Sequence, residues 1–187
     1  MTTPPDSISK PSPSPSTKDT SATLQKPGRS GLDASAVLDH WRRFQRIPGG
    51  KYLFAQLLGF FIPYTGSIKP RVHSLEPGHA VVHLHDRRRV RNHLRSVHAI
   101  ALANLAELTT GLATLSGMPE DARGILTGLD VQYTKKARGI ITGTCTCEFP
   151  ETSERQEYKI PVTLTDEQGD VVVTATATWL IGPKTQG

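Results

Sequence analysis

A long apolar stretch, residues 99–115, constrains the fold of this chain more than any other feature. It contains Ala, Ile, Leu, Thr, Asn and Gly, and Glu107 is the only ionisable side chain between Ala99 and Pro119. A helix that is apolar nearly all round belongs in a protein interior. A carboxylate within it is unfavourable to bury unless it is paired, protonated or used in chemistry. We therefore predict a buried central helix over residues 97–115, with Ser96 as its N-cap, and we treat Glu107 as a candidate functional residue.

The segments on both sides of this helix are typical of strands. Two short helices are expected first: one begins near Leu32 with Asp33 or Ser35 as its cap, and one covers residues 52–58, before Pro63 and Gly66 end that apolar stretch. The predicted strands are residues 68–72, 80–85, 125–134, 139–149, 157–165 and 171–181. Strands with segregated helices indicate an α+β protein, in which a curved antiparallel sheet wraps around one long helix.

Composition divides the chain into four regions. Residues 1–31 contain eighteen Ser, Thr or Pro residues and few large apolar ones, so we predict a disordered tail. Residues 32–66 are expected to form a helical segment, residues 67–182 the main domain and residues 183–187 a short C-terminal tail. The tail has no secretory hydrophobic core, so we expect a cytoplasmic protein, with a mitochondrial presequence left open.

Charge and cysteine content restrict the possible ligands. The net charge of +5 and pI of about 9.4 suit an anionic ligand, but the basic residues do not alternate with aromatic ones, so nucleic acid is not expected. No apolar run reaches the roughly 20 residues that span a bilayer. Cys145 and Cys147 lack metal-ligand spacing and are expected to be reduced thiols. The histidines form no ligand set, so no metal and no separate cofactor are predicted.

The run from Arg91 to Glu107 resembles the signature of hotdog-fold acyl-CoA thioesterases of the phenylacetate-pathway type. In that family an Asn precedes a His-Gly-Gly at the helix start and an acid follows on the helix. Here Asn92 precedes His98 by six residues and Glu107 by fifteen. Residues 129–139 resemble the family's second strand and its bend. The resemblance covers roughly residues 65–182, and the preceding segment is similar to an uncharacterised hotdog subfamily with extra N-terminal helices.

This resemblance implies an α+β hotdog fold and a hydrolase that releases a carboxylic acid and a free thiol in lipid metabolism. Glu107 would be the general base or the nucleophile, and Asn92 would hold the carbonyl, the water or the carboxylate. The Ala99 N–H would face the oxyanion, His98 would orient the helix start, and Thr127 would place a hydroxyl near the carboxylate. Ala99 and Ile100 replace the family's two glycines, which narrows or shifts the site.

Several residues also have a structural interpretation. In that interpretation Glu107 is satisfied by Asn104 or by a backbone group, Asn92 caps a turn, and His98 only orients the start of the helix. Coenzyme A carries phosphates, and basic residues on two loops are the candidates to bind them. These candidates are Arg87, Arg88, Arg89, Lys135, Lys136 and Arg138.

The spacing along the helix predicts how the site is assembled. Nine residues place Glu107 about 13 Å along the helix from His98, too far for one carbonyl to contact both. A second chain with an antiparallel central helix would bring its Glu107 beside Ala99, so we predict a two-fold homodimer with composite sites, and a tetramer stays open.

Two other functions remain as alternatives. The first is a non-catalytic protein that binds acyl thioesters, which the replacement of both glycines favours. The second is a hydroxyacyl-thioester dehydratase that pairs His93 with Glu107, although the proline- and glycine-rich loop of those enzymes is absent between the two residues.

Overall fold

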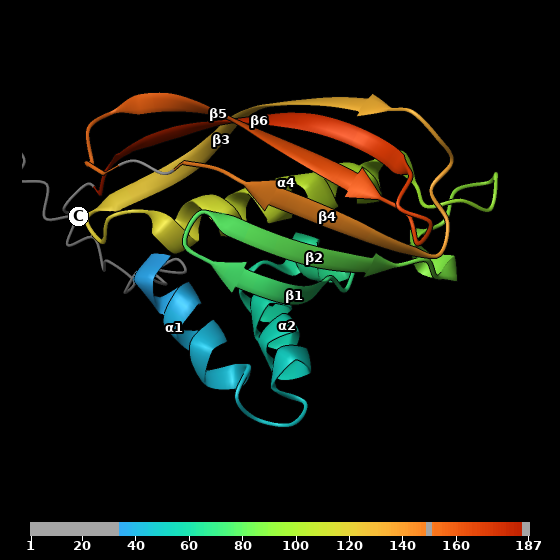
Figure 1. The fold of residues 1–187 in the computed structure, drawn as a ribbon, viewed down its shortest axis with the longest axis horizontal. Helices are drawn as coiled ribbons and strands as arrows, with labels where there is room; N and C mark the ends of the chain where they lie inside the picture. The colour runs from blue at the N-terminus through green and yellow to red at the C-terminus, as the bar shows by residue number, and fades with distance from the viewer. Residues whose placement is uncertain (1–33, 149–150, 185–187) are drawn as a thin grey trace, which may run out of the picture.

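The computed structural model describes residues 34–148 and 151–184, and in them an antiparallel sheet curves around one long helix (Figure 1). The helix is α4 (Ala99–Gly117). The strands are β1 (Arg71–Glu76), β2 (His79–His85), β3 (Ala122–Tyr133), β4 (Ile140–Thr146), β5 (Gln156–Thr165) and β6 (Val171–Pro183). Their order in the sheet is β1-β2-β4-β5-β6-β3, so the strand after α4 lies at the far end and pairs with β6. The predicted α+β hotdog architecture is confirmed.

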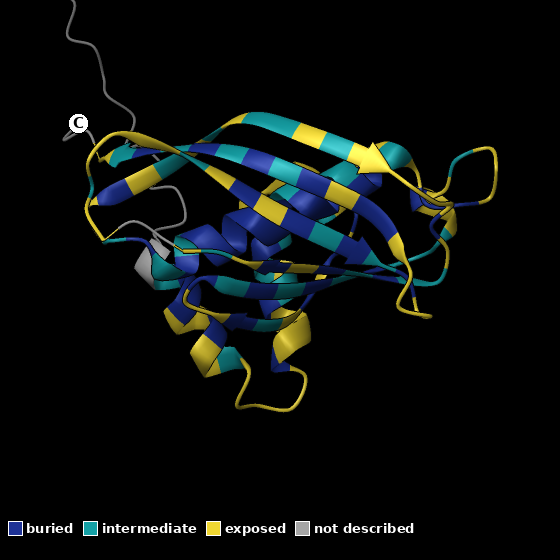
Figure 2. Cartoon of the chain, turned by 45° about the horizontal axis from the view of Figure 1, so that its top comes forward, coloured by how far each residue is buried: buried dark blue, intermediate teal, exposed yellow. Residues whose placement is uncertain are grey.

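Helix α4 forms the centre of the hydrophobic core, as its apolar sequence predicts (Figure 2). Leu105, Ala106 and Ala113 are fully enclosed, and Trp179 of β6 packs across the helix. The Trp179 indole N–H donates a hydrogen bond of 3.2 Å to the Thr110 hydroxyl. By length and composition alone α4 passes as a possible membrane span, but 72% of its most apolar window is buried within the fold. It is therefore placed as a core helix.

Three helices precede the sheet: α1 (Ala34–Phe44), α2 (Gly50–Phe61) and α3 (Pro63–Ser67). In Figure 1, α1 and α2 lie below β1. Trp41 of α1 and Phe54 of α2 pack edge to face at 5.3 Å between ring centroids, which joins the two helices. The predicted tail, residues 1–31, lies outside the described residues, as do Leu32 and Asp33 at the expected helix start.

The connection between α2 and α3 is very short. Helix α2 ends at Phe61, just before Pro63 as predicted, and Pro63 begins α3, where its missing N–H needs no intrahelical partner. The two helices approach so closely that a Cβ on Gly66 would lie 2.7 Å from the Gly59 Cα. Only glycine allows this contact, so Gly66 lets α2 and α3 pack together. It lies within α3 and does not end that helix.

Several element boundaries also differ. The first strand begins at Arg71, since residues through Ile68 continue the helical turn of α3, and β3 begins three residues earlier than predicted. The N-cap of α4 is His98, not Ser96. Ser96 instead donates its hydroxyl to the Asn92 side chain at 3.2 Å, within the loop before the helix. The turn residues 166–170 connect β5 to β6 as predicted.

Candidate functional site

Glu107 lies in the middle of α4 with its side chain half-buried. The Glu107 carboxylate has no hydrogen bond or ion pair with any residue that the structure describes. The nearby Thr110 hydroxyl donates to the backbone carbonyl of Glu107 at 2.9 Å and not to its carboxylate. Burial raises the pKa of Glu107 above its ordinary value. Neither Asn104 nor a backbone group within the described chain satisfies this carboxylate, so it is available to a ligand or to a second chain.

Asn104 lies one helical turn before Glu107 and is 8% exposed. Its Nδ2 approaches the Tyr64 carbonyl at 3.5 Å, and its Oδ1 is buried without a hydrogen-bond partner among the described residues. Residues three apart on a helix share a face, so an unpaired amide oxygen and an unpaired carboxylate neighbour each other. An unpaired buried acceptor is unfavourable, which makes Asn104 a site residue that the sequence suggested only as a partner of Glu107.

The start of α4 presents one free backbone donor. The His98 Nδ1 accepts the Ile100 N–H at 3.1 Å, and the His98 carbonyl accepts the N–H groups of Ala101 and Leu102. The Ala99 N–H has no partner in the described part of the chain. His98 therefore acts as the helix cap and leaves the Ala99 N–H pointing outward, at the end of the helix that favours negative charge.

Two features narrow the surroundings of that donor. The Tyr133 hydroxyl, at the end of β3, donates a hydrogen bond of 3.0 Å to the Ala99 carbonyl, a contact that sequence patterns did not reveal. Ile100, which replaces a family glycine, is 55% exposed, so its side chain adds bulk to the surface next to Ala99.

Asn92 organises the loop that leads into the helix. Its Oδ1 accepts hydrogen bonds from the Leu94 N–H at 2.9 Å and from both the N–H and the hydroxyl of Ser96 at 3.2 Å. Its Nδ2 has no partner among described residues and remains a donor. The Asn92 Oδ1 therefore stabilises the turn, and only the Asn92 Nδ2 group can donate a hydrogen bond to a substrate.

Thr127 lies at a β-bulge within β3. Leu126 pairs with Trp179 and Gly128 with Thr178, which leaves Thr127 as the extra residue. Its hydroxyl donates to the Thr178 carbonyl at 3.1 Å, so this group is already used by the backbone of β6.

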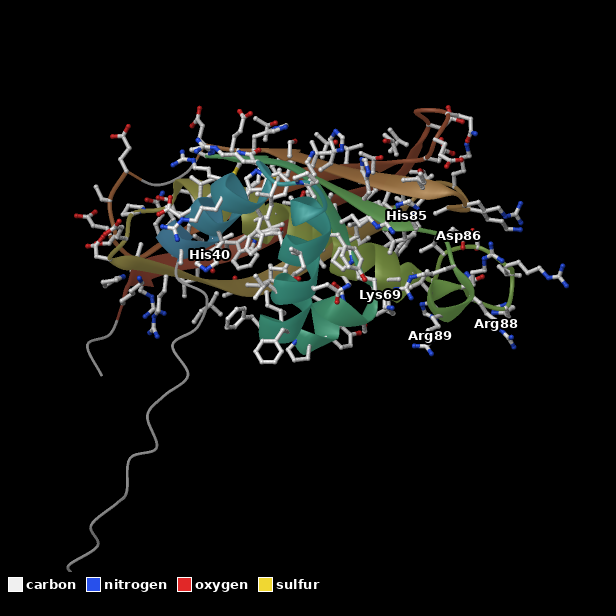
Figure 3. The ribbon with its side chains drawn as sticks, turned by 90° about the horizontal axis from the view of Figure 1, so that it is seen from below. His40, Lys69, His85, Asp86, Arg88 and Arg89 are labelled. Atoms are coloured by element: carbon white, nitrogen blue, oxygen red, sulfur yellow. The ribbon has the colours of Figure 1, made fainter. Side chains whose placement is uncertain are left out.

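The basic residues proposed for CoA phosphates lie on two adjoining loops, which are joined by a hydrogen bond of 2.9 Å from the Asp86 N–H to the Gly139 carbonyl. Lys135 pairs with Asp166 at 2.7 Å and Asp170 at 2.5 Å, which ties the end of β3 to the β5–β6 hairpin. Arg87 donates to the Ser67 carbonyl at 3.1 Å. Arg88 and Arg89 extend outward from the 3-10 turn η1 (Arg88–Val90) (Figure 3). Lys136 and Arg138 are also exposed.

Within one chain these residues form two separate groups. His98, Ala99 and Tyr133 meet at the start of α4, and Asn92 lies in the adjoining loop. Glu107 lies eight residues further along the helix from Ala99, about 12 Å at 1.5 Å per residue. In the described part of the chain, no group of three His, Cys, Asp or Glu residues is placed to hold a metal ion.

Residues 50–181 match the family described as "Domain of unknown function (DUF4442)". The chain belongs to the DUF4442 family. No curated protein sequence matches this DUF4442 protein significantly. Among solved structures, the structural-genomics protein APC5556 is 30% identical, with a TM-score of 0.69, and the match covers 79% of this chain and 99% of that one.

Two further solved structures share the hotdog fold. PA5026 from Pseudomonas aeruginosa, a protein of unknown function described as a probable thioesterase, is 26% identical with a TM-score of 0.65, and the match covers 74% of this chain and 97% of that one. A hypothetical thioesterase from Streptococcus pneumoniae, solved with coenzyme A, is 21% identical with a TM-score of 0.52, over 62% of this chain and 87% of that one. This DUF4442 protein thus shares the hotdog fold with neighbours of which one is described as a probable and one as a hypothetical thioesterase.

Proposed function

We propose that this protein hydrolyses acyl-CoA thioesters to a carboxylic acid and free CoA. The proposal rests on the Glu107 carboxyl group. This group is half-buried on the central helix, has no partner within the described chain, and has a pKa that burial raises above its ordinary value. A general base works best when its pKa lies near the working pH, and burial moves Glu107 in that direction. A similar protein described as a probable thioesterase and a structural neighbour solved with CoA support this substrate class.

The reaction needs a base that activates the water attacking the carbonyl carbon, and a hydrogen-bond donor beside the carbonyl oxygen. Glu107 takes a proton from water, and the water oxygen attacks the thioester carbon. The negative charge that develops on the carbonyl oxygen is held by the Ala99 N–H and the dipole of α4. The intermediate then collapses, the C–S bond breaks, and the CoA thiolate leaves and takes up a proton. In the alternative mechanism the Glu107 carboxylate attacks the thioester carbon directly and forms a covalent acyl-enzyme anhydride, which water then hydrolyses.

Two chains are needed to bring Glu107 and Ala99 to one carbonyl, because about 12 Å of helix separates them. The outer edge of β3 supports such a dimer. β3 is twelve residues long, ends the sheet and pairs only with β6 among described strands. An open edge of this length offers a row of N–H and C=O groups to a second copy. A two-fold axis beside β3 would place the α4 helices antiparallel, and the composite site would take Glu107 from one chain and Ala99 from the other.

A non-catalytic acyl-thioester binding protein is the second candidate. Ala99 and Ile100 favour it, since the added side chains keep a substrate carbonyl further from the backbone than two glycines would.

A panel of acyl-CoAs with a chromogenic thiol reagent separates the two functions. The hydrolase releases thiol, and Glu107→Gln abolishes this release while the fold is retained. Glu157→Gln, a change of an exposed carboxylate on β5, is the matched control and leaves release unchanged. Thiol release that survives in Glu107→Gln would contradict the role of Glu107. Saturable binding of acyl-CoA without release from any substrate would favour the binding protein.

A further inference from the structure

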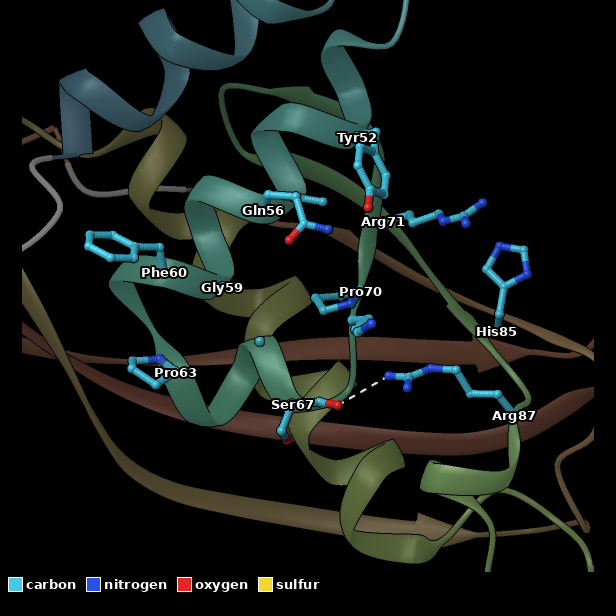
Figure 4. A pocket seen from close by; sticks show the side chains of 13 residues that line it. Tyr52, Gln56, Gly59, Phe60, Pro63, Ser67, Pro70, Arg71, His85 and Arg87 are labelled. Atoms are coloured by element: carbon cyan, nitrogen blue, oxygen red, sulfur yellow. Dashed lines mark hydrogen bonds between the residues drawn. The ribbon is translucent and has the colours of Figure 1, made fainter.

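A cavity of about 730 Å³ lies between the N-terminal helices and the first two strands (Figure 4). Gln56 and Phe60 of α2 and Ser67 of α3 line one side, and Arg71 of β1 and His85 of β2 line the other. A second cavity of about 370 Å³ adjoins it and shares Tyr52, Arg71 and His85. We call the two together the basic groove.

The charged side chains that line the basic groove are all positive. Its cationic lining residues are Lys51, Lys69, Arg71 and Arg87. None of the described residues that line either cavity is Asp or Glu. Cations gathered in a concave site without counter-charges repel one another and attract an anion. Burial lowers the pKa of the neighbouring His85 side chain, and the charge of Arg71 lowers it further, with a smaller opposing effect of Glu167.

The cations are positioned rather than loose. Arg87 donates to the Ser67 carbonyl across the cavity at 3.1 Å (Figure 4), and Lys51 donates to the His73 carbonyl at 2.7 Å. Lys69 is held with φ at +48°, in the left-handed region that a non-glycine residue rarely adopts. Neither Lys69 nor Arg71 forms an ion pair with a described residue, so their charges are free to meet a ligand.

One side of the basic groove also offers a planar apolar surface. The Tyr52 ring lies beside Arg71, and 57% of the residue is exposed. Gln56, one turn further along α2, points toward the same space and carries both a hydrogen-bond donor and an acceptor. An aromatic ring stacks on any nucleobase, and an arginine fork matches a phosphate. The volume is in the range of cavities that hold molecules of this size.

We propose that the basic groove binds a nucleotide, with its phosphates on Lys69, Arg71 and Arg87 and its base against Tyr52. The nucleotide is either free or the terminal portion of CoA. Only the second form rests on the proposed hydrolase function, since binding of a free nucleotide needs no turnover. The concave shape favours a compact phosphorylated ligand over a flat anionic membrane surface.

Calorimetric titration of the full chain with ADP and with CoA tests this proposal. The test variant is Lys69→Asn/Arg71→Gln, in which Asn tolerates the left-handed backbone and Gln keeps much of the Arg length. The control is Lys159→Asn/Arg155→Gln, which removes the same charge from exposed positions at the start of β5, outside both cavities. Thermal unfolding followed by circular dichroism confirms that both variants remain folded.

We expect the groove variant to weaken ADP and CoA binding by about tenfold or more, and the control by less than about twofold, since screened charges outside the groove act weakly. Adenosine should bind at least about tenfold more weakly than ADP, because it lacks the phosphates. Binding of ADP alone with no thiol release from acyl-CoAs would support the groove and contradict the hydrolase.

Three results would overturn the proposal: no saturable binding of either ligand, an equal loss in the control variant, or binding that the groove variant leaves unchanged. Attachment to vesicles that contain phosphatidylserine, without binding of ADP or CoA, would also overturn it and assign the groove to a membrane surface.

Discussion

Asn104 and Glu107 lie one turn apart on the same side of α4, and neither the Asn104 Oδ1 nor the Glu107 carboxylate has a hydrogen-bond partner among the described residues. Both sit in a helix that otherwise packs apolar surface against the sheet. Two adjacent polar groups left unpaired in a core helix are unfavourable for stability, and such unpaired groups are characteristic of functional sites. This relationship leads to predictions for stability, for pH dependence and for the arrangement of two chains.

Glu107 should contribute stability at low pH that is lost as the pH rises above about 4.5. Burial raises the pKa of Glu107 in the folded state above the ordinary 4.5, so the folded protein binds this proton more tightly than the unfolded chain does. The stabilisation is fully present below the unfolded pKa and is lost as the pH rises through the folded pKa. Urea unfolding of wild type and Glu107→Gln between pH 4 and 8 measures it. The variant should lack this contribution to the free energy of unfolding. If the free energies of unfolding of the two proteins changed with pH in parallel, a raised pKa for Glu107 would be contradicted.

The rate of thioester hydrolysis should rise with pH through the same raised pKa. A general base works in its deprotonated form, so kcat/KM reports the Glu107 pKa of the free enzyme on its acidic limb. The midpoint of this limb should lie above 4.5. Glu157→Gln, a change of an exposed carboxylate on β5, should leave that midpoint unchanged. A rate that is flat from pH 4.5 to 8 would argue against a carboxylate base.

Cys147 should react with alkylating reagents near neutral pH. The neighbouring Cys145 thiol lowers the pKa of the Cys147 thiol to about 7, against the opposing effect of burial, and the nearby Thr114 hydroxyl also lowers it. The rate of iodoacetamide labelling, followed by mass spectrometry, should therefore be half-maximal near pH 7. Cys145→Ala should move this midpoint upward, and an unchanged midpoint in that variant would contradict the cause.

The Trp179–Thr110 hydrogen bond should contribute measurably to stability. Thr110→Val keeps the side-chain shape but leaves the buried Trp179 N–H without its acceptor at 3.2 Å. An unpaired buried donor of this kind destabilises a protein by about 1–3 kcal/mol. Urea unfolding monitored by tryptophan fluorescence measures the change. Thr174→Val, on the exposed face of β6, is the control and should change stability by less than about 0.5 kcal/mol.

The features that could be predicted from sequence are those that depend on local pattern. The apolar run around Glu107 predicted the buried helix, and turn residues predicted the hairpins, because periodicity and turn chemistry act over a few residues. His98 replaced Ser96 as the N-cap because Asn92 already binds the Ser96 hydroxyl, a contact that depends on the loop's three-dimensional path.

The basic groove could not be predicted in the same way. Lys69, Arg71 and Arg87 come together only because α2 and α3 pack beside β1 and β2. That packing depends on the close approach of Gly59 and Gly66, which follows from tertiary contacts and not from the helical pattern of either segment. The Tyr133 contact with the start of α4 is likewise a contact between residues far apart in sequence.

The composite site is the central claim, and mixed dimers test it most directly. Asn92→Ala disrupts the loop at one end of the site, and Glu107→Gln removes the carboxylate at the other. Each variant alone should be inactive toward acyl-CoA. Unfolding and refolding them together in equal amounts should restore about a quarter of wild-type thiol release, since half of the dimers are mixed and each mixed dimer has one intact site. Mixed dimers that form and release no thiol would contradict a site shared between two chains.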